Sequence, residues 1–238
     1  MNEMKYQSTE EGYQISKEII KKYISKFDSE EEKERVLTNL FKRFDKNTSL
    51  EDVVIKVTAL NALYNAGLNN SEGSKTIDVF SMAKHIVSEP EFDSWLDSEN
   101  ADIQMKAYKY IESGTSVFRD SNYNNCYAFA SKYCSWHKPD KFPIMDSCAK
   151  KSLYNIIVSE DNDFSFTVDG KTPKIEASDF HDYDIFSKAC KSLRDYIVEK
   201  YDVGKEFDLK ELDKYLWERG RIIDSNATGR NLAKIGGE

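Results

Sequence analysis

The spacing of apolar residues along the chain predicts a mostly helical protein. Between 29 and 44, apolar side chains recur three and four residues apart, and Ser29 with Glu32 forms a capping-box signature. The segment 49–67 is apolar almost all round, which predicts a central buried helix that Gly67 can close. Further helices are predicted at roughly 75–87, at 98–114, at 124–136, from 146 or 147 onward, over 185–197, and at 208–220, where Gly220 ends the last one.

One segment has strand character. Phe164, Phe166 and Val168 alternate with polar residues ahead of the pair Asp169-Gly170, which is typical of a hairpin turn. We therefore expect a small β-hairpin near 163–177, inserted in an all-α body. No linker or internal repeat divides the 238 residues, which predicts a single helical domain, 1–238, that can be built from two lobes.

The composition is that of a soluble globular protein, with 39% apolar and 32% charged residues. No apolar run reaches eighteen residues and the N-terminus has no apolar signal core, so neither a membrane span nor secretion is expected, and the location is predicted to be cytoplasmic. The four cysteines contain no C-x-x-C pair, which indicates reduced thiols. With only three histidines, no metal site and no cofactor are predicted.

The net charge of −8 counts against a protein that coats nucleic acid, because phosphate binding needs local positive charge. Two stretches are nevertheless basic. Residues 132–151 hold five lysines against two aspartates, and residues 219–234 hold four cations against one aspartate. In the second stretch, Trp217 is expected to anchor the core while Arg219 and Arg221 lie outside it. An acidic protein with one basic face can still bind DNA.

The stretch "SWHKPDKFPIMDS" carries the candidate chemistry. Pro139 and Pro143 cannot sit inside a helix, so they predict a loop between two helices. Asp146 falls where the second helix begins and can accept backbone N–H bonds as an N-cap. The simplest interpretation is a cap and nothing more. The alternative is a partly desolvated carboxylate, kept ionised by the helix end, that activates water or stabilises a cation.

These residues resemble the catalytic segment of the helix–hairpin–helix DNA glycosylases. "FPIMDS" (142–147) resembles their proline loop and catalytic aspartate, "FASK" (129–132) resembles their Phe-Ala-x-Lys helix, and "VTALNALYNAGL" (57–68) looks like one of their core helices. The 8-oxoguanine type, including the archaeal GO glycosylases, is the most similar. The resemblance implies two helical lobes around a helix–hairpin–helix-like core, with the site between the lobes.

The resemblance also implies an activity. Asp146 would activate water and stabilise the sugar cation while a flipped base is hydrolysed from double-stranded DNA. Two departures matter. The family's Gly-hydrophobic-Gly turn is missing, and Asn125 stands where bifunctional members carry the nucleophilic lysine, so a glycosylase without lyase activity is expected.

The implied base pocket and DNA-backbone contacts draw on residues around Asp146. The candidate pocket residues are Asn125, Tyr127, Lys132, Trp136, His137 and Phe142, with Tyr123 as a further wall, although Tyr127 can equally pack in the core. The candidate phosphate contacts are Lys138, Lys141, Lys150 and Lys151. The substrate base would be oxidised guanine or a modified phage base, which leaves repair and phage defence both open for a monomeric enzyme.

Two other interpretations remain open. The first is a catalytically inactive helical module that binds DNA or a protein, which the acidic charge and the missing glycine turn favour. The second is a metal or small-molecule enzyme that uses the cysteine and histidine side chains. Stoichiometric metal in the purified protein would support that last one.

Overall fold

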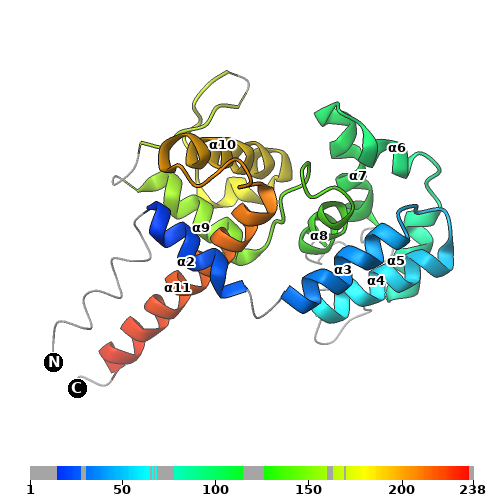
Figure 1. Ribbon diagram of the computed structural model, residues 1–238, viewed down its shortest axis with the longest axis horizontal. Coiled ribbons are helices and arrows are strands. Elements are labelled where there is room, and N and C mark those ends of the chain that lie inside the picture. The colour runs from blue at the N-terminus through cyan, green and yellow to red at the C-terminus, as the bar shows by residue number, and fades with distance from the viewer. Residues whose placement is uncertain are drawn as a thin grey trace. The chain divides into compact units, whose positions relative to one another are not determined.

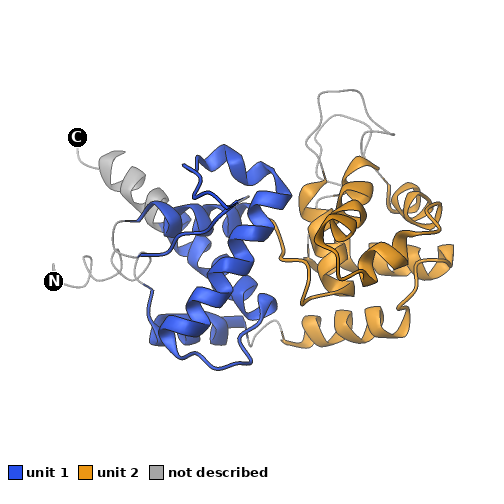
Figure 2. Ribbon diagram, turned by 90° about the horizontal axis from the view of Figure 1, so that it is seen from above, with its two compact units in different colours: residues 1–29, 146–238 blue, residues 30–145 orange. Residues whose placement is uncertain are grey.

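The computed structural model is mostly helical, and helices form wherever the apolar spacing predicts them within its described part (Figure 1). The structure describes residues 15–27, 31–64, 66, 68, 78–114, 126–159, 163–168 and 170–235, with side chains up to residue 225. The chain divides into two compact units (Figure 2): unit 2 comprises residues 30–145, and unit 1 comprises residues 1–29 and 146–238. No helix in these ranges is both long enough and apolar enough to cross a bilayer.

Unit 2 is a helical bundle with an apolar core. Its helices are α3 (Glu31–Arg43), α4 (Leu50–Tyr64), α5 (Val79–Val87), α6 (Phe92–Asp97), α7 (Ala101–Ser113) and α8 (Tyr127–His137). Fully buried side chains from several of these helices, among them Leu37, Leu60, Ile86, Ile111 and Phe129, fill the core. The side chains of Asp78 and Asn100 cap α5 and α7, and α7 ends at Gly114, as the sequence predicts.

Helix α4 is less completely buried than the sequence predicts. Val53, Val57 and Leu60 are completely buried, but Ile55 and Leu63 are 44% and 37% exposed. The reason is geometric, since helices α3, α5 and α8 pack on α4 and leave part of its circumference uncovered. Ser29 and Gly67, the residues expected to cap α3 and to close α4, lie outside the described residues.

Unit 1 contains α2 (Lys17–Ser25), α9 (Ser147–Val158), the short 3₁₀ helix η2 (Ala177–His181), α10 (Tyr183–Tyr201) and α11 (Leu209–Ile235). Helix α11 packs against both α9 and α2, so it is the central helix of this unit (Figure 1). Its first turn is capped by Asp208, whose carboxylate accepts the N–H groups of Lys210 and Glu211 at 2.9 Å each.

Two expectations for α11 are wrong. The helix does not end at Gly220 but continues to Ile235. Gly220 is a helix-interior residue that allows a close helix contact, because a β-carbon there would lie 2.3 Å from the carbonyl oxygen of Cys148. Arg219 is completely buried instead of lying outside the core, so it adds nothing to a basic face.

The predicted β-hairpin is not formed. Within the described part of 163–177, one isolated antiparallel bridge joins Val168 to Lys171. The alternation itself is real, since Phe164 and Phe166 are buried while Asp163, Ser165 and Thr167 are exposed. The Phe164 ring packs 5.3 Å from that of Tyr196 on α10, so the apolar face is buried against a helix without needing a second strand.

Candidate functional site

The connection from α8 to α9 has the predicted form. Helix α8 ends at His137, residues 138–145 form a connector, and α9 begins at Ser147. Asp146 is the N-cap of α9, with extended backbone (φ −131°, ψ −179°) and an Oδ1 that accepts the Ala149 N–H at 2.8 Å. The capping role predicted from the sequence is therefore confirmed.

Only one of the two carboxylate oxygens of Asp146 takes part in this cap. The residue is partly exposed, and its second oxygen, Oδ2, has no hydrogen-bond partner within the described ranges. Its charge reaches two neighbours on the first turn of α9. Burial raises the pKa of the Cys148 thiol, and Asp146 raises it further. Burial lowers the pKa of Lys150, and Asp146 opposes that change. Within the described part of the chain, one oxygen is thus fixed by the cap and the other is not.

Helix α9 is held tightly by α11, which fixes the position of the cap. Gly220 lets the α11 backbone approach the Cys148 carbonyl closely. One turn further along α9, the buried Arg219 guanidinium donates to the Ser152 carbonyl at 3.0 Å and to Asn155 Oδ1 at 2.7 Å. Charge-assisted bonds of this kind in a buried position resist rearrangement. The carboxylate of Asp146 is therefore built on a rigid helix pair.

The residues predicted to line a base pocket belong to unit 2, whereas Asp146 belongs to unit 1. The Trp136 ring lies edge-on to Tyr64, with centroids 5.5 Å apart, and 6.2 Å from the ring of Phe41. Lys132 is 7% exposed, and its Nζ donates to the Tyr64 carbonyl oxygen at 3.2 Å, where it caps the end of α4.

The remaining pocket candidates differ in their exposure. Phe142 is 2% exposed and is a core residue of unit 2. Tyr127 is partly buried in the first turn of α8. Asn125 and Tyr123 lie outside the described residues. Phe129, the first residue of the FASK segment, is completely buried and packs in the core.

A buried polar cluster that the sequence analysis missed surrounds His137. Lys56 of α4 is completely buried, and its Nζ donates to the carbonyl oxygens of Phe44 (2.8 Å) and Lys46 (2.9 Å) and to Asn47 Oδ1 (2.7 Å). The His137 Nε2 lies 3.2 Å from the same Nζ. Burial lowers the pKa of Lys56 to about 8. Burial and the Lys56 ammonium hold the pKa of His137 well below its ordinary range.

The cluster extends through Asn47 to a tyrosine and a carboxylate. Asn47 Oδ1 also accepts the Tyr133 hydroxyl at 2.6 Å, and its Nδ2 donates to Asp93 Oδ1 at 2.6 Å. The cluster thus joins the segment after α3 to α4, α6 and α8. The one sequence signal for it is a single lysine inside the apolar run of α4. Its hydrogen bonds hold the C-terminal turn of α8 in place, which is where Trp136 and His137 lie.

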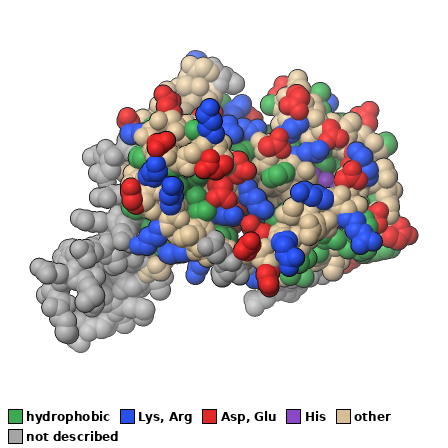
Figure 3. Space-filling view, in the orientation of Figure 1, with side chains coloured by type: hydrophobic (Ala, Val, Ile, Leu, Met, Phe, Trp, Pro, Cys, Tyr) green, Lys and Arg blue, Asp and Glu red, His purple; other side chains and the backbone are tan. Residues whose placement is uncertain are grey.

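Three of the four lysines predicted to contact DNA phosphates are ion-paired: Lys138 with Asp97, Lys141 with Glu99 and Lys151 with Asp224. The fourth, Lys150, is partly buried. Acidic and basic side chains are interspersed over the face seen in Figure 3. To bind phosphate, these lysines would have to leave their carboxylate partners. Binding of this electrostatic kind is sensitive to the salt concentration.

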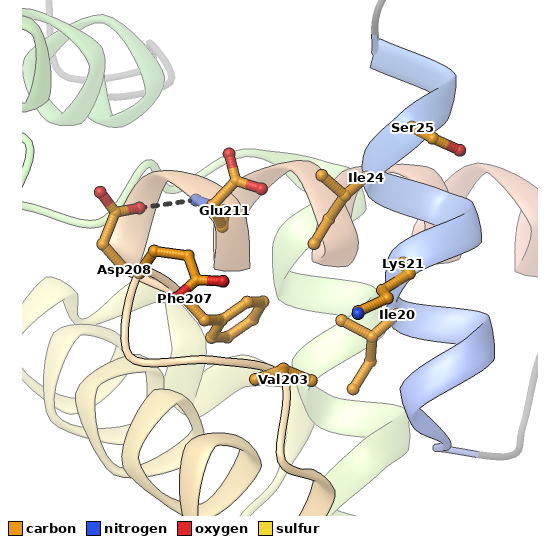
Figure 4. Close-up of a pocket in the computed structure, with 9 residues that line it drawn as sticks. Ile20, Lys21, Ile24, Ser25, Val203, Phe207, Asp208 and Glu211 are labelled. Atoms are coloured by element: carbon orange, nitrogen blue, oxygen red, sulfur yellow. Dashed lines mark hydrogen bonds between the residues drawn. The ribbon is translucent and has the colours of Figure 1, made fainter.

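A cavity of about 510 Å³ opens in unit 1 between α2 and the segment that leads into α11 (Figure 4). Ile20, Ile24 and Phe207 form its apolar side, and carboxylates such as Asp208 and Glu211 lie at its edge. No residue of the predicted site lines it. Among the described residues, no group of three or more histidine, cysteine or carboxylate side chains is arranged to hold a metal ion.

Comparison with known proteins places the chain in a family. The family model HI_0787_N, described as an N-terminal domain, matches residues 19–141. This chain belongs to that family. A protein from Haemophilus influenzae, described as uncharacterized, is 28% identical over 155 residues, which are 65% of this chain and 63% of that protein. The chain thus spans less than two thirds of that relative's length. No solved structure matches the chain.

The matched range defines what the family domain contains. It includes the whole Lys56 cluster and the candidate pocket residues of α8, and it ends at residue 141. Asp146 and the α9–α11 pair that holds it lie beyond the matched range.

Proposed function

We propose that this protein is a monofunctional DNA glycosylase that removes a damaged or modified base, with Asp146 as its catalytic carboxylate. The observation that supports the proposal is the hydrogen bonding of the two Asp146 carboxylate oxygens and the packing of the helix that bears them. Oδ1 is fixed by the cap bond to Ala149, Oδ2 has no partner among the described residues, and α9 is held by α11. The resemblance of 129–132 and 142–147 to the glycosylase catalytic segment supplies the reaction.

The chemistry requires one carboxylate and one water molecule. The bond between C1′ of the sugar and the base nitrogen breaks, and its electron pair leaves with the base. Oδ2 faces the positive charge that develops on the sugar and accepts a proton from the water whose oxygen bonds to C1′. Because the cap bond fixes Oδ1, the carboxylate does not have to reorient during the step. Asn125 offers no amine, so the product is an abasic site without strand cleavage.

The test is to incubate the protein with duplex oligonucleotides carrying 8-oxoguanine, uracil or hypoxanthine, and with phage DNAs that carry modified bases. Alkali then cuts any abasic site. We expect alkali-dependent cleavage of at least one of these DNAs, and a loss of about 10²–10⁴-fold in rate in Asp146→Asn. Asparagine is an equally good N-cap, so this variant should keep the fold. Unchanged cleavage by Asp146→Asn would contradict the role assigned to Asp146.

A catalytically inactive DNA- or protein-binding module is the second candidate. The pairing of Lys138, Lys141 and Lys151 with carboxylates lowers the positive charge available to DNA, and so favours the protein-binding form of this candidate. This candidate predicts no base release from any of these DNAs. Any binding to unmodified duplex would be unchanged in Asp146→Asn. Duplex binding that weakens with salt would identify DNA as the partner, whereas no duplex binding would leave a protein as the partner.

A further inference from the structure

The residue directly before Asp146 is held by a side chain of α8. The Met145 N–H donates to the Ser131 Oγ at 3.0 Å, and that Oγ lies 3.3 Å from the Met145 carbonyl oxygen. It also lies 3.1 Å from the carbonyl oxygen of Ala128, three residues back on its own helix. Ser131 and Met145 are both completely buried. A hydroxyl has one proton, so Ser131 accepts from Met145 and donates to one carbonyl oxygen at a time.

This contact differs from the usual behaviour of serine inside a helix. A helical serine commonly donates to a carbonyl oxygen three or four residues back, which needs nothing from outside the helix. Here the same oxygen also accepts a backbone N–H from a residue fourteen positions on, between buried groups. Without Ser131, the buried Met145 N–H would lose its partner. The Met145 carbonyl belongs to the peptide bond that joins Met145 to Asp146, so Ser131 acts on the peptide that precedes the cap.

We propose that Ser131 is a positioning residue for the Asp146 carboxylate. Its catalytic consequence rests on the function proposed above. Two restraints meet at Asp146. On the N-terminal side, Ser131 Oγ accepts the Met145 N–H and can donate to the Met145 carbonyl oxygen in alternation with that of Ala128. On the C-terminal side, the bond from Ala149 and the close approach of Gly220 to Cys148 hold the first turn of α9. The Met145 N–H bond to Ser131 thus restrains the backbone just before Asp146, and the Ala149 N–H bond restrains its Oδ1.

Positioning can be measured without any substrate. In Ser131→Ala, amide hydrogen exchange followed by NMR should become at least about 10-fold faster at Met145, which loses its acceptor, and also at Ala149, which reports on the cap. Ser135→Ala is the matched control. Ser135 is buried on the same helix, one turn away, and its hydroxyl forms no hydrogen bond to a described residue. Exchange at Ala149 that is equal in both variants would overturn the proposal.

Activity gives an independent readout, using the DNA that the wild-type protein cleaves fastest among those tested above. In single-turnover assays, Ser131→Ala should slow base release about 10-fold and leave the Kd for DNA unchanged, while Ser135→Ala changes neither. In the Asp146→Asn background, Ser131→Ala should have no additional effect, because there is no longer a catalytic carboxylate to position.

The outcomes separate the two proposals. If Asp146→Asn removes activity while Ser131→Ala reacts at the wild-type rate, the positioning role is wrong and the proposed function stands. If Asp146→Asn is fully active, or no DNA is cleaved, the proposed function is wrong and hydrogen exchange at Ala149 decides the structural role of Ser131. If Ser131→Ala slows base release equally with and without Asp146, Ser131 acts elsewhere and the positioning role is again wrong.

Discussion

Lys56→Met should destabilise unit 2, by an amount that grows as the pH rises above 8. Methionine matches the length of the lysine stem but removes the ammonium and its three hydrogen bonds. The carbonyl oxygens of Phe44 and Lys46 lose this donor, whereas Asn47 Oδ1 keeps the Tyr133 hydroxyl. The side chain is completely buried, so water cannot replace the lost donor without opening the cluster.

Two opposing terms set the magnitude at neutral pH. Hydrogen bonds to a charged group contribute about 1.5–3 kcal/mol each, so losing three costs on the order of 5–9 kcal/mol. Against this, folding must keep Lys56 charged although burial lowers its pKa from 10.5 to about 8. That difference corresponds to a cost of about 3 kcal/mol for burying the charged lysine, and the uncharged methionine variant does not have this cost. We expect a net loss of about 2–6 kcal/mol in the free energy of unfolding at pH 7.

The pH dependence follows from the sign of the same pKa change. Because the pKa of Lys56 is lower in the folded protein, the unfolded chain binds more protons between pH 8 and 10.5, and stability rises with pH in that window. From pH 7 to pH 9.5 the wild type gains about 2 kcal/mol from this group, and Lys56→Met gains nothing from it. His137, whose pKa lies well below 6.5, stays neutral in this range and cannot cause the change.

The assay is urea denaturation, followed by circular dichroism at pH 7 and pH 9.5. Lys109→Met, at an exposed position on α7, is the matched control and should follow the wild type at both pH values. The decisive quantity is the stability difference between the wild type and Lys56→Met. If that difference is the same at both pH values, Lys56 titrates at its ordinary pKa, and its three acceptors fully offset the burial of the charge.

Two further predictions test the packing of the fold. Gly220→Ala should destabilise the protein by about 1–3 kcal/mol, because the new methyl group collides with the Cys148 carbonyl, even though alanine favours helix more than glycine does. Denaturation beside the exposed control Ser225→Ala measures this, and an equally stable Gly220→Ala would refute the close contact. Burial raises the pKa of the Cys134 and Cys190 thiols, so a thiol reagent should modify them only after denaturation. Labelling of either one at the rate of a free thiol in the native protein would contradict their burial.

Local signals account for what the sequence predicted correctly. The two prolines before Asp146 and its position at the start of an apolar-periodic run predict the loop and the cap, and both are present. Neither signal needs information from distant residues. Asp78 and Asn100, which were not predicted as caps, also make their capping bonds within three residues.

The errors come from contacts between residues far apart in the chain. Gly220 looks like a helix end, but its missing side chain serves a contact with α9, seventy-two positions earlier. The alternation around Phe164 looks like a strand, but α10 covers that face. Arg219 looks exposed in its local sequence, yet its partners are on α9. A pattern in one segment shows that a face is buried, and only the fold shows what buries it.

The same distinction applies to Asp146. A cap needs only an acceptor for the first turn of its own helix, and asparagine or serine serves as well as aspartate. Nothing in that role requires a second carboxylate oxygen without a partner among the described residues, close packing by Gly220 and Arg219, or the Ser131 contact to Met145. Each of these has a structural reason of its own, since buried polar groups need partners and helices must pack. What packing alone does not predict is coupling: a change at Ser131 that disturbs the bond between Ala149 and Asp146, and that affects base release only while residue 146 carries a charge.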